Sequence, residues 1–261
     1  MKEELHVESA GAGPGTPLVL VHGFPLDGRM WEHQRQRLSQ GRLLLVPDLA
    51  GFGLSPMHGD GHSVEDHAQD LAGMLEARSI SSAVVCGFSM GGYVALACAA
   101  LFPRNVAGLI LANTRASADT PDVRQARTRS AQRLLREGTD FLVEEMAPKL
   151  VSAAAQQGRP DLMARLRTIM AAQSPEACAA AQIAMRERQD RTADLAGVRC
   201  PVLVVVGAED AVTPPADARA MARTANKAEF VEVPLAGHAA CMERADVFND
   251  ALAAFLARWA L

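Results

Sequence analysis

The chain has 261 residues, of which 49% are hydrophobic and 21% are charged, and its formal net charge is −4. This composition excludes a disordered chain, and the length fits one large domain or a domain with an insertion. Because the pI is near 6.0, the sequence lacks the basic surface that nucleic acid or an anionic membrane would attract, and neither is expected as a partner.

Short segments that are apolar throughout are predicted to be strands; they are residues 17–21, 42–47, 83–87, 106–112, 201–207 and 230–233. Continuous rather than alternating apolar runs indicate a parallel sheet that is covered on both faces. Helical patterns separate these segments, at residues 30–38, 63–78, 90–101, 214–224 and 244–259. Ser63 and Asp66 form a variant capping box at the start of the second helix. The alternation predicts a doubly wound α/β fold.

The alternation of strands and helices stops between residues 115 and 197, a stretch rich in Ala, Arg, Gln and Met. We expect four or so short helices here, inserted between two strands of the sheet. Ligands of such sheets bind at the carboxyl ends of the strands, and an insertion at this place would lie over that edge. We therefore predict a core formed by residues 1–114 and 198–261, and a helical cap formed by residues 115–197.

Residues 80–103 contain no charged residue, and a stretch of this kind could suggest a membrane span. Glycines at positions 87, 91 and 92 interrupt the stretch, so a buried strand turning into a buried helix explains it better, and no membrane span is expected. The first 15 residues hold no apolar stretch of the kind found in signal peptides. The five cysteines are widely spaced and include no CxxC pair, which is typical of reduced thiols in a cytoplasmic protein.

A nucleophile is indicated by the sequence GFSMG at residues 87–91, between a predicted strand and a predicted helix. In this context G-x-S-x-G forms a nucleophile elbow, a strained turn that exposes the serine hydroxyl at the end of the sheet. The glycines are needed because neighbouring backbone comes too close for a Cβ atom. Ser89 is therefore the predicted nucleophile.

A serine nucleophile needs a base and an acid that orients the base. His238 follows the last predicted strand, and Asp210 follows the strand before it. The chain order Ser, Asp, His is the order expected for this architecture. Glu209 is the alternative acid, but the loop position favours Asp210. Asn113, after the earlier strand, cannot serve as a carboxylate.

An oxyanion hole needs two N–H donors. Met90, directly after the nucleophile, supplies the first, and the loop after the strand at residues 17–21 should supply the second. Gly23 permits a tight turn in that loop, so Phe24 is the predicted second donor. His22 is expected to brace the loop by hydrogen bonding and is left out of the catalytic set.

Two further segments invite a functional interpretation but are predicted to be structural. In PDLAGFGLS at residues 47–55, the glycines permit positive φ and Asp48 is expected to satisfy backbone donors. The histidines and acids of residues 58–67 fit no zinc spacing, so an exposed loop and a capped helix are expected there rather than a metal site.

These motifs together resemble the α/β-hydrolase superfamily over almost the whole chain. The segments HGFPLDGRMW, PDLAGFGLS, GFSMGG, GAEDAVTP and AGH occur in the family order and at family-like spacings. HGFPLDGRMWEHQ and GFSMGG are similar to cofactor-free haloperoxidases and perhydrolases, whereas LILANTRASADTP and the C-terminal third look more like 3-oxoadipate enol-lactonases and small carboxylesterases. Only ELHVES precedes the Gly-rich loop, where relatives usually have a hairpin, so we expect about seven strands.

The resemblance implies that Ser89 attacks an acyl carbon while His238, oriented by Asp210, takes its proton, with the N–H groups of Phe24 and Met90 holding the oxyanion. Water activated by the same histidine then hydrolyses the acyl-enzyme. It also implies a small-molecule ester or lactone as the substrate and no metal or organic cofactor. The expected enzyme is a carboxylesterase similar to 3-oxoadipate enol-lactonase.

Four residues are expected to contact the substrate: Phe24, Phe88, Arg115 and Met146. The two phenylalanines lie in site-forming motifs, and Met146 belongs to an insertion whose Ala, Leu and Met residues predict an adaptable aliphatic roof. Arg115 could bind a substrate carboxylate, as an enol-lactone acid would require. The alternative is that the arginines of the insertion form a solvated helix face.

Three other functions stay open at this point. The same residues would serve a perhydrolase or haloperoxidase, which makes a peracid from acetate and peroxide, or an acyl thioesterase. A small-ligand receptor on the same fold is the non-enzyme alternative. The natural substrate, chain-length preference, stereoselectivity and oligomeric state cannot be read from the sequence.

Overall fold

A computed structural model describes residues 5–57 and 62–261 of the chain. Within these ranges seven strands form one sheet, in the order β1-β3-β2-β4-β5-β6-β7. The strands are β1 (Val7–Ala10), β2 (Ala12–Val21), β3 (Gln40–Pro47), β4 (Ala83–Phe88), β5 (Val106–Ala112), β6 (Val202–Gly207) and β7 (Ala228–Val233). Neighbouring strands are parallel except for the antiparallel pair of β1 and β3. The α/β fold and a mostly parallel sheet of seven strands are therefore confirmed.

The edge strand β1 is the strand that the apolar pattern did not predict. It pairs with β3 so that Val7 lies opposite Pro47 and Ala10 opposite Leu44. None of its four residues is fully buried, so it lacks the continuous apolar run that marks the central strands. An edge strand with one neighbour can be this polar because only part of its surface is covered.

Twelve α-helices cover the sheet or lie beside it in the described residues: α1 (Glu32–Leu38), α2 (Val64–Ala77), α3 (Met90–Leu101), α4 (Pro121–Glu137), α5 (Asp140–Met146), α6 (Ala153–Gly158), α7 (Pro160–Ala171), α8 (Pro175–Glu187), α9 (Thr192–Gly197), α10 (Pro215–Thr224), α11 (Ala240–Glu243) and α12 (Ala245–Arg258). Short 3-10 helices are η1 (Gly28–Trp31), η2 (Pro103–Asn105) and η3 (Ala147–Leu150). The capping box of α2 is present, with Ser63 and Asp66 bonded reciprocally.

One predicted helix begins differently from the expectation. The pattern placed a single helix over residues 30–38, but the chain first forms η1 and then α1. The reason is the side chain of Asp27, which accepts a hydrogen bond from the Arg29 N–H and so caps a turn that starts two residues earlier.

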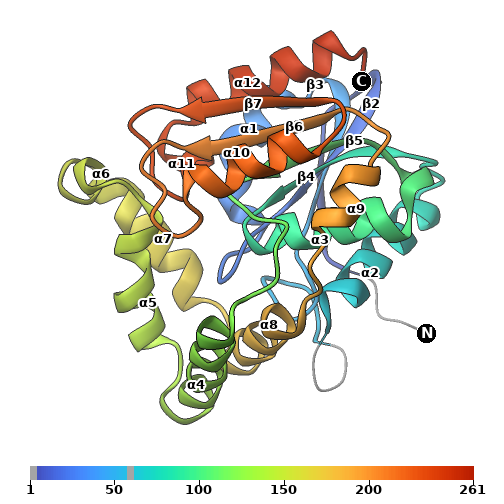
Figure 1. Cartoon of the computed structure of the whole chain (residues 1–261). Coiled ribbons are helices and arrows are strands. Elements are labelled where there is room, and N and C mark those ends of the chain that lie inside the picture. The colour runs from blue at the N-terminus through green and yellow to red at the C-terminus, as the bar shows by residue number, and fades with distance from the viewer. Residues whose placement is uncertain (1–4, 58–61) are drawn as a thin grey trace.

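The strands bury both of their faces, as continuous apolar runs require. In β4, Val85 packs into one apolar cluster with α2, α3 and α10, whereas Val84 and Cys86 pack into a second cluster with α1 and α12. The helices thus form a layer on each side of the sheet (Figure 1). This burial fixes the strand register, and with it the positions of the loops at the strand ends.

Residues 115–197 lie between β5 and β6 and contain no strand, as expected. The expectation of four or so short helices was too low: the stretch holds the helices α4–α9, and α4 is 17 residues long. The sequence of α4 lacks Gly and internal Pro, so nothing interrupts it before Gly138. The helices α4–α8 gather at the side of the molecule toward which the arrowheads of β6 and β7 point (Figure 1).

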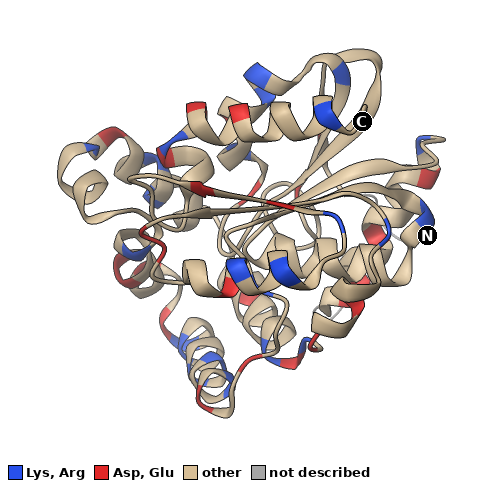
Figure 2. Ribbon diagram, turned by 45° about the horizontal axis from the view of Figure 1, so that its top comes forward, with Lys and Arg blue, Asp and Glu red and all other residues tan. Residues whose placement is uncertain are grey.

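Charged residues lie mainly along the outer helices, and the central strands are almost free of them (Figure 2). Blue and red segments are interspersed in that view, so neither sign dominates the ribbon. In the part of the chain that the structure describes, no helix combines the length and the apolar character needed to cross a membrane.

Candidate active site

Ser89 occupies a strained turn between β4 and α3. Its φ is 52°, a left-handed value that a non-glycine residue adopts only when the surroundings force it. The Ser89 N–H donates to the Ala112 carbonyl at 2.9 Å, and its own carbonyl accepts from the Gly92 N–H at 2.9 Å. The backbone is thereby held from both sides, and the hydroxyl stands at the carboxyl end of the sheet.

The glycines of the turn are required by close backbone contacts. A Cβ atom at Gly87 would overlap the carbonyl of Gly91, and a Cβ atom at Gly91 would overlap the carbonyls of Val21 and His22. The latter contact shows that the turn after β4 packs directly against the loop after β2. The two loops expected to form the oxyanion hole are therefore neighbours.

His238 lies in the loop between β7 and α11 and is 1% exposed. Its Nε2 is 2.9 Å from the Ser89 Oγ, and its Nδ1 is 2.9 Å from Asp210 Oδ2. The ring of Phe88 packs against the imidazole with a centroid separation of 5.0 Å. The structure thus brings together the serine, histidine and aspartate that the sequence singled out.

Asp210 follows β6 and is buried, whereas the neighbouring Glu209 is exposed. The Asp210 carboxylate accepts hydrogen bonds from the N–H groups of Val212 and Thr213 and from the Thr213 hydroxyl. Burial alone would raise the pKa of this carboxyl, but the charge of His238 and hydrogen bonds from His238, Asn113 and the Thr213 N–H lower the pKa to about 2. Asp210 is therefore ionised at neutral pH and can orient a histidine and stabilise its protonated form.

Two residues around Asp210 were missed as site residues by the sequence reasoning. The Asn113 amide donates to Asp210 Oδ2 at 2.8 Å, and the Thr213 Oγ1 lies 2.7 Å from Asp210 Oδ2 and 3.3 Å from His238 Nδ1. A signal for Asn113 existed in its place directly after a predicted strand. Its φ of 47° is one that asparagine tolerates better than most residues.

The loop after β2 carries Phe24, which precedes Pro25 across a cis peptide bond. The Leu26 N–H donates to the Gly23 carbonyl at 2.9 Å and closes a tight turn. A Cβ atom at Gly23 would overlap the ring of Phe88, so glycine is needed here as well. Phe24 is buried and packs edge to face on Phe52, with ring centroids 6.5 Å apart.

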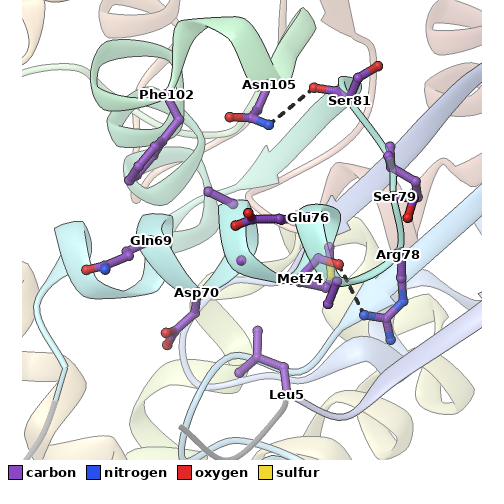
Figure 3. Close-up of a pocket in the computed structure, with 14 residues that line it drawn as sticks. Leu5, Gln69, Asp70, Met74, Glu76, Arg78, Ser79, Ser81, Phe102 and Asn105 are labelled. Atoms are coloured by element: carbon purple, nitrogen blue, oxygen red, sulfur yellow. Dashed lines mark hydrogen bonds between the residues drawn. The ribbon is translucent and has the colours of Figure 1, made fainter. Parts of the chain in front are cut away.

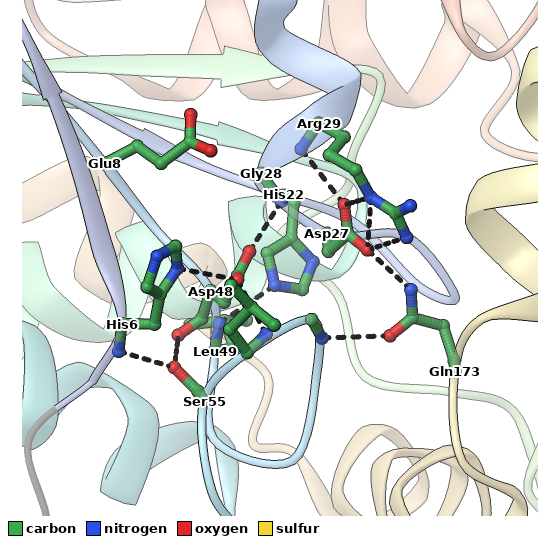
Figure 4. A network of polar contacts seen from close by, with 12 residues as sticks. His6, Glu8, His22, Asp27, Gly28, Arg29, Asp48, Leu49, Ser55 and Gln173 are labelled. Atoms are coloured by element: carbon green, nitrogen blue, oxygen red, sulfur yellow. Dashed lines mark hydrogen bonds and ion pairs between the residues drawn. The ribbon is translucent and has the colours of Figure 1, made fainter.

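His22 braces this loop, as the sequence predicted. Its Nε2 accepts from the Leu49 N–H at 2.9 Å (Figure 4). Its Nδ1 lies 3.1 Å from the Gly23 carbonyl oxygen. Burial lowers the pKa of the imidazole, so His22 is neutral at pH 7 and its Nδ1–H donates to that carbonyl. The histidine ties the loops after β2 and β3 together.

Asp48 satisfies backbone donors in the loop after β3, again as expected. It accepts from the N–H groups of Gly28 and Leu54 at 2.8 and 2.9 Å (Figure 4). Gly51 and Gly53 have φ values of 87° and 56°. A Cβ atom at Gly53 would also overlap the Asp48 carboxylate, so this segment is a shaped turn.

The inserted helices contact this network through Gln173, which lies between α7 and α8. Its amide nitrogen donates to Asp27 Oδ2 at 2.7 Å, and its amide oxygen accepts from the Gly53 N–H at 3.1 Å (Figure 4). Burial would raise the pKa of Asp27, but hydrogen bonds from Arg29 and Gln173 lower it below its ordinary value. The buried amide of Gln173 thus joins the insertion to the loop after β2, which contains Phe24, and to the loop after β3.

The residues expected to bind substrate lie in different surroundings. Phe88 is fully buried beneath His238, and Met146 is half-buried and packs against both apolar clusters. The guanidinium of Arg115 donates to the Val212 carbonyl at 2.7 Å and lies 3.4 Å from Asp217 Oδ2. Arg115 thus contacts the loop before α10 and the first turn of α10.

A surface pocket of about 770 Å³ lies elsewhere, along α2 and the segment that follows it (Figure 3). Its polar lining is already bonded in part, since Asn105 donates to the Ser81 carbonyl and Arg78 to the Met74 carbonyl. None of the residues expected in the active site lines this pocket. It is separate from the Ser89 site.

The cysteines and the potential metal ligands are the other candidates for a second site within the described residues. All five cysteines are unpaired, and burial raises the pKa of Cys86 and of Cys241 above the ordinary thiol value. Among residues 5–57 and 62–261, no group of three or more His, Cys, Asp or Glu side chains is placed to hold a metal ion. His58 and Asp60, which the sequence reasoning considered for a metal, lie outside the described residues.

Comparisons with known proteins place this geometry in a family context. Residues 16–245 match the model of a family described as having the alpha/beta hydrolase fold. A thermophilic esterase from Thermogutta terrifontis is 40% identical with a TM-score of 0.95, over 98% of this chain and 94% of that chain. The enol-lactonase from Burkholderia xenovorans LB400 is 29% identical with a TM-score of 0.91, over 97% of this chain and 96% of that chain. The 3-oxoadipate enol-lactonase 2 of Acinetobacter baylyi is 26% identical over 98% of this chain and 94% of its own length.

Proposed function

Since the chain belongs to the α/β-hydrolase family and is an ester hydrolase, we propose a mechanism for it. It cleaves carboxylic esters or lactones through an acyl-enzyme on Ser89. The observation that carries the proposal is the unbroken line of contacts from the Ser89 hydroxyl through His238 to Asp210. All three side chains are buried, and the backbone beside Ser89 and His238 is closely packed at Gly87, Gly91 and Gly237. Such preorganisation is what nucleophilic catalysis requires.

In the first step, His238 Nε2 accepts the Ser89 proton as the oxygen attacks the acyl carbon. The imidazolium that forms is stabilised by the Asp210 carboxylate, which stays ionised because its pKa is about 2. His238 then protonates the leaving alcohol, or the enol oxygen of a lactone, and the C–O bond breaks. Water enters, gives a proton to His238 and attacks the acyl carbon; His238 then returns this proton to the Ser89 oxygen as the acyl C–O bond breaks, and the acid is released.

The oxyanion of each tetrahedral intermediate is assigned to the N–H groups of Phe24 and Met90. Met90 is the first residue of α3, so its N–H adds to the positive end of the helix dipole. The close packing of the loop after β2 on the turn at Ser89 supports a shared position for the two donors. The bracing by His22 would keep that loop in place while charge develops.

We assign residues 1–114 and 198–261 to the catalytic core and residues 115–197 to a cap. The side of the molecule on which α4–α8 gather supports this division (Figure 1). Under such a cap, Phe24 and Met146 would contact the acyl part of the substrate, with Phe88 supporting His238 from below. A substrate carboxylate on Arg115 is not part of the proposal, because Val212 and Asp217 already engage its guanidinium.

The substrate class proposed first is a small carboxylic ester or an enol-lactone. It is supported by the similarity to an esterase and to two enol-lactonases over nearly the whole chain. A perhydrolase is the second candidate, favoured by the segment HGFPLDGRMWEHQ, which resembles those enzymes. Halogenation that depends on peroxide and on added acetate would distinguish it from a simple esterase.

The proposal is tested by the hydrolysis of p-nitrophenyl esters of increasing chain length. Ser89→Ala is expected to lose at least about 10⁴-fold in kcat/KM, because the nucleophile is removed while the fold is retained. Ser81→Ala, at an exposed serine, is the matched control and should behave like the wild type. A silent wild type that a fluorophosphonate does not label at Ser89 would overturn the proposal.

A further inference from the structure

Glu243 is a buried carboxylate close to the histidine loop that the mechanism above does not use. It ends α11, five residues after His238, and is 6% exposed. One carboxylate oxygen accepts from the Gly237 N–H at 2.9 Å and from the Ser152 N–H at 3.0 Å. The other oxygen accepts from the Ser152 hydroxyl.

The charge of Arg159 acts on Glu243, but the two side chains form no direct ion pair. Among the ion pairs formed by the described residues, none includes Glu243. A buried carboxylate is costly unless hydrogen bonds replace its lost hydration, and bonds from backbone N–H groups are the means by which Glu243 is satisfied. The carboxylate can therefore stay buried only while Gly237 and Ser152 both lie against it.

These two partners come from different parts of the molecule. Gly237 immediately precedes His238 in the core, whereas Ser152 lies between η3 and α6, in the insertion. Glu243 is thus a bridge between the segment that carries the proposed base and the segment that we assign to the cap.

The backbone on both sides of His238 is in contact with the same inserted segment. The Ala239 N–H donates to the Leu150 carbonyl at 2.5 Å. A Cβ atom at Gly237 would overlap the backbone of Val151 and Ser152. Residues 150–152 therefore pack along residues 237–239, and the Glu243 carboxylate closes the arrangement.

We propose that Glu243 is a positioning residue, which holds residues 237–239 on residues 150–152 and so keeps His238 Nε2 at the Ser89 hydroxyl. The inserted segment then takes part in placing the base as well as in covering the substrate. This inference rests on the proposed role of His238. A positioning role differs from a purely structural role because it makes kcat per active site depend on Glu243.

The decisive variant is Glu243→Gln, which keeps the size of the side chain but replaces one acceptor oxygen by a donor. The neutral amide has one acceptor oxygen instead of two, so the hydrogen bonds that join the two segments lose the strength that the negative charge gives them. With a p-nitrophenyl ester as the substrate, kcat per active site should fall about tenfold while KM stays within about twofold, since a small displacement of the base slows chemistry more than binding.

Titration of active sites with a fluorophosphonate separates the two possible roles. A purely structural Glu243 would lower the number of titratable sites and leave kcat per titrated site unchanged, and this result would overturn the inference. Glu76→Gln, at an exposed position of α2, is the matched control and should leave both quantities as in the wild type.

Ser152 gives a second test if Glu243→Gln does not fold. Ser152→Ala removes the hydroxyl donor and should lower kcat per titrated site about threefold, whereas Ser152→Thr retains the hydroxyl and should restore it. Equal kcat per site in Ser152→Ala and the wild type would contradict the inference. A wild type without esterase activity or Ser89 labelling would instead overturn the proposed function, and the inference with it.

Discussion

The carboxyl edge of the sheet and the inserted helices use polar side chains in opposite ways. At the sheet edge, Ser89, His238 and Asp210 are buried and contact one another in a single line. In residues 115–197, polar side chains mostly form exposed ion pairs between helices, such as those of Arg124 with Glu187 and Arg133 with Glu145. Exposed pairs contribute little to stability.

The exceptions in the insertion include the buried ion pair of Arg188 with Asp119 and the side chains that reach the core. Gln173 contacts the loops after β2 and β3, and Ser152 contacts Glu243. We infer from the comparison that a polar residue affects the catalytic rate when it is buried and contacts a loop at the end of a strand. Exposed polar residues without such a contact should have little effect on that rate. The substitutions below test this distinction.

The largest effect is expected at the acid of the sheet edge. Asp210→Asn should lower kcat by about 10³- to 10⁴-fold, because the amide no longer stabilises the protonated histidine and favours the wrong tautomer. Glu209→Gln, at the exposed neighbour, should change kcat less than about twofold. Steady-state rates of p-nitrophenyl ester hydrolysis measure both variants, and equal losses would make the distinction between them wrong.

A smaller effect is expected at Asn113, which was not in the predicted site. Asn113→Ala removes the donor 2.8 Å from Asp210 and should lower kcat about tenfold with little change in KM. Asn105→Ala, which removes a similar donor at an exposed backbone carbonyl, should leave the rate unchanged. A normal rate in Asn113→Ala would mean that the remaining partners of Asp210 suffice.

The lowered pKa of Asp210 predicts a pH dependence of stability. The folded-state pKa is about 2 against 3.8 in the unfolded chain, so the stabilisation is complete above about pH 5 and is lost as the pH falls toward 2. Between pH 5 and pH 3 the loss should be about 1 kcal/mol in the free energy of unfolding. Urea unfolding of the wild type and Asp210→Asn at both pH values measures it, and an identical pH dependence in the two proteins would refute the assignment.

The smallest effect is expected at the start of the insertion. Arg115→Ala should change KM by less than about twofold for both a neutral and a carboxylate-bearing ester, because its guanidinium is engaged by Val212 and Asp217. Kinetics with a matched pair of such esters gives the answer. A selective rise in KM for the anionic ester would show that Arg115 does bind a substrate carboxylate.

The sequence predicted what depends on apolar runs and on local turn chemistry. The central strands are continuous apolar segments. The glycines around Ser89 predict a turn in which neighbouring backbone leaves no room for a Cβ atom. The positions after β6 and β7 then point to Asp210 and His238. Because parallel strands end at one edge, residues 149 positions apart, Ser89 and His238, could be expected to meet there.

What the sequence did not predict depends on contacts between distant segments. Nothing local at Glu243 or Ser152 indicates that the Ser152 hydroxyl donates to the Glu243 carboxylate. The edge strand β1 has too few buried residues to stand out. The surroundings of Arg115 depend on how the loop before α10 folds back, which composition alone cannot specify.

The central claim is that turnover passes through an acyl group on Ser89, and mass spectrometry tests it most directly. The enzyme is quenched in acid during turnover of p-nitrophenyl acetate and then digested. The account predicts one added acetyl group on the peptide that contains Ser89, and none in Ser89→Ala. Turnover without an acetyl group on Ser89, or with the acetyl group on another residue, would contradict it.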